Sequence, residues 1–215
     1  IRWILVTHTH QDHSPAANEL RERTGAQVLG RIASYPQNQD PAFKPDHILA
    51  HGERLAIDQD TTLAVFHTPG HASNHLCYLL EQERMLFTGD HVMQASTVVI
   101  GPPDGDMAVY LRSLRRLLGI GLRWLAPGHG FLMAAPDQVI EGIIAHRLKR
   151  EAKVVAAMST LGPASTDALL ASVYDDVRPA LHPMARRSLT AHLLKLRDDG
   201  RARLHGDTWS LVDAA

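Results

Sequence analysis

The sequence holds one cysteine and almost no net charge, and each scarcity excludes a class of protein. Cys77 is the only cysteine among 215 residues, so no intrachain disulfide can form. Because this fits a reducing compartment, we predict a cytoplasmic protein. A net charge of −1 gives the whole chain no electrostatic signature of nucleic-acid or membrane binding. No apolar run reaches the roughly 18 residues that span a bilayer, and no secretory signal is apparent.

Histidine is the residue type in excess, with 14 in the chain. The densest cluster is His-Thr-His-Gln-Asp-His at positions 8–13, directly after a short apolar run that predicts a strand. Residues two apart on an extended segment face the same way, so His8 and His10 can bind one metal. The loop that follows then turns Asp12 and His13 toward a second. Three imidazoles and a carboxylate within six residues indicate a metal site.

Three further motifs place a polar side chain on a glycine-containing turn after a predicted strand. They are Thr-Pro-Gly-His ending at His71, Thr-Gly-Asp ending at Asp90 and Pro-Gly-His-Gly around His129. Glycine lets the backbone turn sharply, so each side chain can point from a strand end into a shared cleft. Histidine and aspartate ligands without cysteine suit zinc, and open coordination positions suit catalysis.

Apolar periodicity predicts an α/β fold for the first 150 residues. Ser14 is expected to cap a helix that stops at Gly25, and Cys77 is expected to be a small core side chain. Short strands are predicted at 1–6, 27–29, 63–67, 76–80, 85–88 and 124–126, and further helices at 108–118 and from Asp137 onward.

From about residue 151 the pattern changes to three helical runs followed by a hairpin. The helices are expected at 152–161, 166–174 and 183–199 with no strand between them, and the hairpin strands at 201–204 and 208–212. This is the order of a winged helix-turn-helix. We therefore predict two domains, a catalytic one at 1–150 and a winged-helix-like one at 151–215.

The ordered motifs resemble those of the metallo-β-lactamase superfamily, whose members form a four-layer αββα sandwich with metals at one sheet edge. The resemblance covers residues 1–132, and the C-terminal region is similar to the winged helix of one group of lactamase-β-like hydrolases. It implies an enzyme with two zinc ions per chain. The implied ligands are His8, His10 and His71 for the first metal, Asp12, His13 and His129 for the second, and Asp90 as the bridge.

The resemblance also implies a mechanism, in which a hydroxide shared by the two metals attacks a carbonyl or phosphoryl centre. Asp12 and Asp90 would be the catalytic carboxylates that orient it. Family members carry strands upstream of the first motif, whereas this chain starts at Ile1, without a methionine and seven residues before His8. We therefore predict that the sandwich is N-terminally incomplete here.

Departures from subfamily patterns narrow the choice of function. His10 stands where the flavodiiron branch has glutamate, which disfavours an oxygen-reducing iron site. True zinc β-lactamases lack the bridging aspartate found here as Asp90, so hydrolysis of antibiotics is not expected. The 38 residues between Asp90 and His129 leave no room for the domain inserted in β-CASP nucleases. Glyoxalase II-like thioesterases share the seven ligands but carry a different helical region at the C-terminus.

Three functions stay open. The first, which we predict, is hydrolysis of a small-molecule ester or thioester, with no membrane partner. In this reading the winged helix packs on the catalytic domain or on a second subunit of a homodimer. The second is a single-strand endoribonuclease. The third is a winged-helix binding module with a relic metal site, which seven intact ligands argue against. For the second, RNA phosphates would contact Arg186, Arg187, Lys195, Arg197, Arg201 and Arg203.

The remaining histidines are expected to play no direct part in binding metal. Three of them, His67, His75 and His91, flank the ligands and are expected to support them or to lie exposed, with proton donation to a leaving group as the alternative. The others are expected at the surface or at helix caps: His47, His51, His146, His182, His192 and His205.

Overall fold

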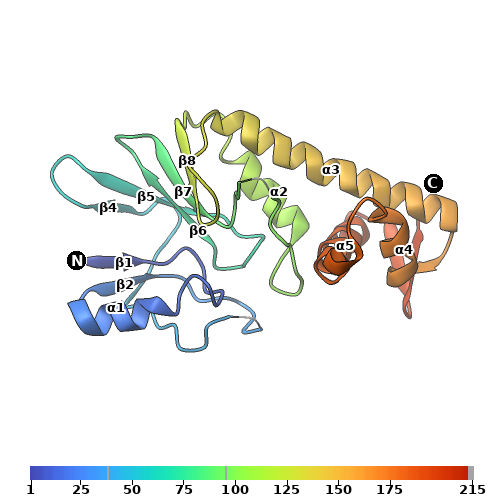
Figure 1. Ribbon diagram of the computed structural model, residues 1–215, viewed down its shortest axis with the longest axis horizontal. Coiled ribbons are helices and arrows are strands. Elements are labelled where there is room, and N and C mark those ends of the chain that lie inside the picture. Colours follow the sequence, from blue (N-terminus) through green and yellow to red (C-terminus); the bar gives the residue numbers. More distant parts are fainter. Residues whose placement is uncertain (38, 95, 213–215) are drawn as a thin grey trace.

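A computed structural model describes residues 1–37, 39–94 and 96–212, and it stacks the elements of the first domain in four layers (Figure 1). Helix α1 covers a three-stranded sheet, a five-stranded sheet lies on this one, and α2 and α3 cover the far side. The predicted αββα sandwich is thus confirmed. Its elements are β1 (Trp3–Leu5), α1 (Ala16–Thr24), β2 (Gln27–Gly30), β3 (His47–Ile48), β4 (Arg54–Ala56), β5 (Thr62–His67), β6 (Leu76–Leu80), β7 (Met85–Gly89), α2 (Met107–Arg115), β8 (Trp124–Pro127) and α3 (Pro136–Leu161).

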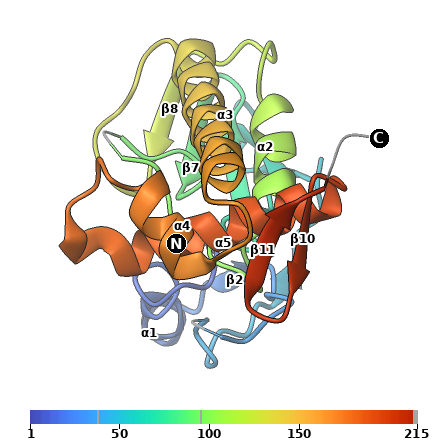
Figure 2. The same cartoon turned by 90° about the vertical axis from the view of Figure 1, so that its right-hand side faces the viewer.

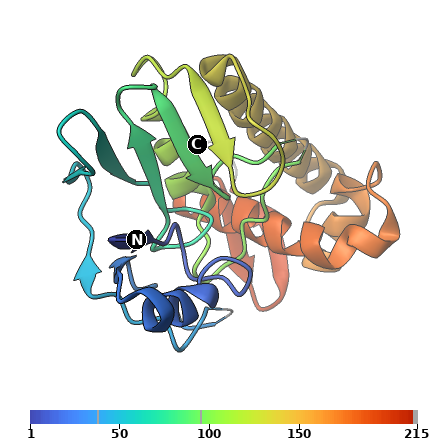
Figure 3. The same ribbon diagram turned by 60° about the vertical axis from the view of Figure 1, so that its left-hand side comes forward.

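The strand directions explain why the polar motifs meet. The five-stranded sheet has the order β4-β5-β6-β7-β8, antiparallel from β4 to β7 and parallel between β7 and β8. Strands β5, β7 and β8 therefore run in the same direction, and the turns that follow them emerge at one edge of the sheet. The parallel three-stranded sheet, β1-β2-β3, lies beside it (Figure 3). Strand β1 leads into the segment 8–13 on the same side.

Apolar side chains fill each interface between layers. Leu86 and Leu125 of the five-stranded sheet pack with Leu111 and Leu114 of α2 and with Ile140 of α3, all essentially inaccessible to water. Burying a leucine-sized side chain contributes about 1.5–3 kcal/mol, so this interface holds α2 and α3 on the sheet. Smaller clusters fill the space between the two sheets and the space under α1.

The C-terminal region is a winged helix, as predicted, joined to the sandwich by α3 (Figure 2). Its own core contains Leu169, Leu189, Leu193 and Trp209. Ala191 of its longest helix is buried in the core of the first domain, so the two regions pack on each other. Its elements are β9 (Ala164–Ser165), α4 (Thr166–Val173), the short 3-10 helix η1 (Pro179–Leu181), α5 (His182–Asp198), β10 (Ala202–His205) and β11 (Thr208–Leu211).

Several details differ from the predictions. Helix α3 continues for 26 residues through position 151, where we expected a new helix; the domain boundary at 150 stays a prediction. The Ser14 hydroxyl donates to Asp40 Oδ2 (2.9 Å) instead of capping α1. Strand β9 lies between two helices where no strand was expected, because it pairs with β11.

Two predictions about single side chains had opposite outcomes. Cys77 is a fully buried core residue, as expected, and burial raises the pKa of its thiol to about 12. His192, expected at the surface or at a cap, is fully buried in α5 beside Glu151 of α3.

None of the helices in the described ranges combines the length and the apolar character needed to cross a bilayer.

Candidate metal centre

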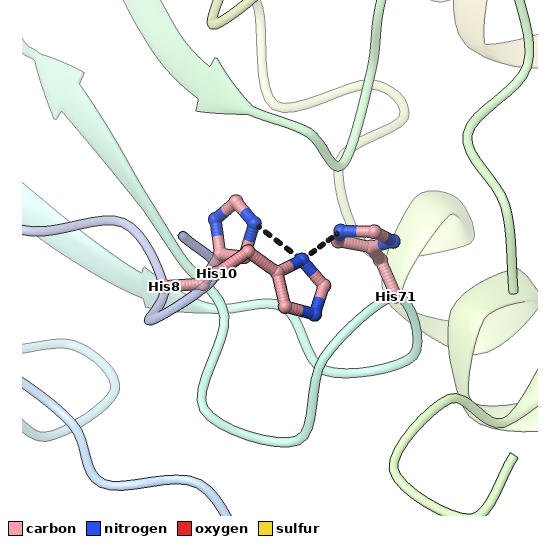
Figure 4. Close-up of side chains that lie close together, drawn as sticks. All are labelled: His8, His10 and His71. Atoms are coloured by element: carbon pink, nitrogen blue, oxygen red, sulfur yellow. Dashed lines mark hydrogen bonds between the residues drawn. The ribbon is translucent and has the colours of Figure 1, made fainter. Parts of the chain in front are cut away.

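Three imidazoles converge on one point at the edge of the sandwich. His8 and His10 come from the segment after β1, and His71 comes from the turn after β5 (Figure 4). The Nδ1 atom of His10 lies 3.0 Å from the Nε2 atoms of both His8 and His71. Neighbouring ligands around a tetrahedral zinc with Zn–N bonds of 2.0–2.1 Å are separated by about 3.3 Å. The spacing of these nitrogens therefore fits a single metal ion.

Burial keeps these imidazoles neutral, which is the form that binds metal. Burial lowers the pKa of His8 well below its ordinary value and that of His71 to about 4, and neighbouring imidazoles add to the effect. The Nδ1 atom of His71 donates to the Val99 carbonyl (2.8 Å), which leaves its Nε2 lone pair facing the cluster. Such a bond fixes both the tautomer and the ring orientation of a metal ligand.

A second cluster, on the open side of the first, contains Asp12, His13 and His129. Asp12 Oδ2 lies 3.3 Å from His129 Nε2 and 3.7 Å from His13 Nε2. The side chains of Asp12 and His129 are 61% and 47% exposed, whereas those of His8 and His71 are 0% and 8% exposed. A metal in the second cluster would therefore face solvent and substrate more directly than one in the first.

Asp90, on the turn after β7, stands between the two clusters. Its Oδ2 lies 3.7 Å from His71 Nε2 and 4.0 Å from His8 Nε2, while its Oδ1 lies 3.2 Å from His13 Nε2 and 3.6 Å from His129 Nε2. One carboxylate oxygen thus faces each cluster.

The site contains buried polar atoms that a cation would satisfy. His13 Nε2 and Asp90 Oδ1 are buried, and apart from their 3.2 Å contact with each other neither has a hydrogen-bond partner among the described residues. Such atoms are rare in folded proteins, and a divalent cation between them would satisfy both. Together with the ligand spacing and the histidine and aspartate donor set, this means that the residues fit a pair of divalent cations.

Buried residues behind the site hold Asp90 and His71 in place. The backbone N–H of Asp90 donates to His75 Nε2 (3.2 Å), so the His75 proton sits on Nδ1 and donates to the Thr68 hydroxyl (3.0 Å). Gly70, before His71, has φ +136°, and a Cβ there would lie 2.3–2.5 Å from the backbone and Cβ of Tyr110. Only glycine lets this turn approach α2 so closely.

A cavity of about 390 Å³ opens beside the two clusters. Its walls include four of the predicted ligands, His10, Asp12, His71 and Asp90. Among the described residues, the rest of its lining comes from three glutamines, the 99–104 loop and one side chain of the winged helix: Gln11, Gln37, Gln39, Val99, Gly101, Pro102, Pro103, Asp104 and Arg187.

The structure brings all seven predicted ligands together; that they hold metal stays a prediction. His75 and His91 are fully buried behind the ligands, so they support the site and cannot reach a leaving group. His67 donates from Nε2 to the Ser73 carbonyl (2.9 Å) and does not line the cavity. Gln39 and Asp104 were not predicted from the sequence; the only local signal for them was the Pro-Pro-Asp-Gly turn at 102–105.

Comparisons with known proteins agree with this geometry. Residues 1–129 match the family profile described as "Metallo-beta-lactamase superfamily", and residues 165–209 match the "Beta-lactamase associated winged helix domain". A solved metallo-beta-lactamase family protein from Thermus thermophilus superposes with a TM-score of 0.82 at 24% identity, over 99% of this chain and 80% of that one.

Two curated relatives add information at the sequence level. An atrochrysone carboxyl ACP thioesterase from Aspergillus fumigatus is 32% identical over 161 residues, which is 75% of this chain and 48% of the relative. A beta-lactamase-like protein 2 homolog from Drosophila melanogaster is 29% identical, over 95% of this chain and 71% of the relative. The chain thus spans about half the length of the first of these relatives.

Proposed function

Because the chain belongs to the metallo-beta-lactamase superfamily and gathers seven histidine and aspartate side chains beside one cavity, we propose that it is a hydrolase with two zinc ions that cleaves a small-molecule ester or thioester. The position of Asp90 is the main support. Its two carboxylate oxygens face different clusters, which is the arrangement that a bridging ligand requires.

The ligand set divides between the two ions. His8, His10 and His71 would hold the first, the second would bind to the ligands Asp12, His13 and His129, and Asp90 would bind both. When bound, two such cations supply a nucleophile at neutral pH and stabilise negative charge on the reacting oxygen.

The protein's own carboxylates would orient the attacking water. Asp12 is the more exposed of the two and lines the cavity, so its free oxygen can accept a hydrogen bond from a water there. Asp90 is held rigidly, because His75 fixes its backbone N–H. Positioning of this kind lowers the activation barrier by removing the entropy cost of alignment.

The cavity walls favour a thioester over an oxygen ester. Of the described residues that line the cavity, the titratable ones that are not predicted ligands are Asp104 and Arg187. A thiol has a pKa of about 8.5 and leaves as its anion without help, whereas an alkoxide needs a proton donor. The Aspergillus relative is a thioesterase by name, which supports the same choice.

Of the six basic side chains of the winged helix that the endoribonuclease alternative requires, four are paired with carboxylates, and among the described residues only Arg187 and Arg203 have no carboxylate partner. Arg186 pairs with Asp167, Arg197 with Asp198, and Lys195 and Arg201 both with Glu151. These charges are neutralised within the protein, whereas binding of RNA depends on cations free to contact phosphates. The volume of the cavity, in contrast, is that of a small-molecule site.

The proposal is tested with zinc-loaded protein and three substrates: butyryl-N-acetylcysteamine as a thioester, ethyl butyrate as an ester and a single-stranded RNA. We expect the thioester to be hydrolysed fastest. His129→Ala should lower its turnover strongly, and His205→Ala, at the exposed hairpin, should leave it unchanged. RNA cleavage without hydrolysis of the thioester or the ester would overturn the proposal.

A further inference from the structure

Among the described residues that line the cavity, Arg187 is the one that belongs to the winged helix. It belongs to α5, yet its guanidinium lies against Gly101 in the loop of the catalytic domain that follows His91. A Cβ built on Gly101 would lie 2.5–2.8 Å from the Nη2, Nε and Cζ atoms of Arg187. Atoms of another side chain cannot approach a Cβ so closely. The guanidinium can therefore occupy this position because residue 101 has no side chain.

The guanidinium of Arg187 is unpaired, unlike its neighbours on the same helix. Among the described residues none forms an ion pair or a side-chain hydrogen bond with it, whereas Arg186, Lys195 and Arg197 all have carboxylate partners. An arginine directed into a cavity without a carboxylate partner has all its donors free for a ligand. Its planar fork binds a carboxylate or a phosphate through two parallel hydrogen bonds.

One carboxylate oxygen of Asp104, the acidic residue on the same wall, already accepts hydrogen bonds from the protein. Asp104 Oδ2 accepts hydrogen bonds from Gln39 Nε2 and from the backbone N–H of Ser73, both at 3.1 Å. Among the described residues, the hydrogen bonds of Asp104 are with Gln39 and Ser73 and none is with Arg187, so this carboxylate does not bind the guanidinium directly. The cavity thus has predicted metal ligands at one place in its wall and a free cation at another.

We propose that Arg187 binds an anionic group of the substrate, a carboxylate or a phosphate, while the scissile carbonyl lies at the metal clusters. The substrate is then an acidic thioester, and the winged helix contributes to substrate specificity. This inference rests on the proposed function, since it concerns the same cavity.

Hydrolysis of matched thioesters tests the inference. Butyryl-N-acetylcysteamine is neutral, glutaryl-N-acetylcysteamine carries a carboxylate on the acyl side, and butyryl-phosphopantetheine carries a phosphate on the thiol side. In the zinc-loaded wild type we expect a lower KM for one of the two anionic thioesters than for the neutral one. The thioester with the lower KM identifies the side on which the anion lies.

Variants then assign the effect to Arg187. Arg187→Gln should raise the KM of the preferred anionic thioester about tenfold or more and change that of the neutral one less than twofold, since a hydrogen bond to a charged group contributes more than a neutral one. Arg187→Lys should restore part of the loss, and Arg186→Gln is the matched control. Gly101→Ala should reproduce the effect by displacing the guanidinium, and it should add nothing in the Arg187→Gln background.

A binding measurement separates this inference from the proposed function. Calorimetric titration with glutarate and with inorganic phosphate should give weaker binding to Arg187→Gln than to the wild type and to Arg186→Gln. Equal KM values and equal binding in the wild type and Arg187→Gln would overturn the role of Arg187 and leave the hydrolase intact. Binding that depends on Arg187 in a protein that hydrolyses none of the thioesters would support the anion site and overturn the proposed function.

Discussion

Asp90 stands between the two histidine clusters, and one of its carboxylate oxygens faces each. Replacing it by alanine would remove a predicted ligand from both ions of the proposed centre and leave the imidazoles close together without the negative charge between them. Loss of a residue that merely supports a ligand lowers metal affinity or activity about 10–100-fold, so loss of this bridge should lower kcat/KM by at least about 100-fold. We expect Asp90→Ala to retain at most one zinc per chain by elemental analysis.

The matched control is Asp60→Ala, which removes an exposed carboxylate from the turn between β4 and β5. It should keep wild-type zinc content and activity. If Asp90→Ala retained two zinc ions and full turnover, the bridging role would be refuted.

His75 acts on the site through Asp90 and not by direct contact with substrate. It accepts the Asp90 backbone N–H at Nε2, so replacing it by alanine frees the loop that carries the bridging carboxylate. We expect His75→Ala to weaken zinc binding about 10–100-fold, measured by competition with a chelating dye. His75→Gln, whose side-chain oxygen can accept the same bond, should recover part of this loss. Equal zinc affinity in wild type and both variants would contradict the positioning role.

The residues of the two clusters could be predicted from the sequence because each motif is local. Three imidazoles and an aspartate occur within residues 8–13, and a glycine-containing turn marks each of the other three ligands. Arg187 was predicted only as one of six candidate phosphate contacts. Its place in the cavity depends on how α5 packs on the sandwich and on the empty space at Gly101, which no local pattern encodes.

Helix α3 links the two domains through one buried carboxylate. Glu151, near its middle, contacts the Lys195 ammonium (3.0 Å), the Arg201 guanidinium (3.1 Å) and the His192 ring (3.7 Å) of the winged helix. Burial alone would raise the pKa of Glu151, but the nearby His192 ring and the Lys195 ammonium outweigh it and lower that pKa to about 2. The charged carboxylate therefore stabilises the fold above its unfolded pKa, and that stability is lost as the pH falls toward 2.

Glu151→Gln removes this charge and leaves its cationic neighbours uncompensated. Breaking a buried ion pair from one side destabilises a protein by about 3–5 kcal/mol, and we expect the lower end because Arg201 is half exposed. Urea denaturation at pH 7 measures the change, with Glu141→Gln, on an exposed position of the same helix, as the control. A change below 0.5 kcal/mol, the ordinary range for surface substitutions, would contradict a structural role for this cluster.

The same cluster explains where the element predictions were wrong. The charged stretch around position 151 interrupts the apolar pattern of α3, which suggested a new helix, yet the winged helix covers and pairs these charges. His192 was placed at the surface because its burial depends on Glu151, 41 positions earlier in the chain. Strands β3, β4 and β9 span two or three residues each, too short for alternation to be visible.

At the scale of the whole molecule, buried neutral histidines make stability depend on pH. Burial lowers the pKa of His71 to about 4 and that of His91 to about 3, while an unfolded histidine titrates near 6.5. Below about pH 6.5 the unfolded chain therefore binds protons that the folded chain does not. The free energy of unfolding of metal-free protein should fall by about 1.4 kcal/mol or more per pH unit between pH 6 and pH 5.

Urea titrations of the chelator-treated protein at several pH values measure this dependence. His91→Phe keeps an aromatic ring against Tyr110 and removes one titrating group, so it should reduce the slope. A free energy of unfolding that stays constant from pH 7 to pH 5 would contradict the neutral, buried state of these rings.

The two-metal site is tested most directly by titrating metal-free protein with zinc while following hydrolysis of butyryl-N-acetylcysteamine and glutaryl-N-acetylcysteamine. Three predicted ligands for each ion and one bridging carboxylate predict that activity rises and reaches a plateau at two zinc ions per chain. Full activity at one zinc ion per chain, or no hydrolysis at any zinc concentration in a folded protein, would contradict the proposal of a two-zinc hydrolase.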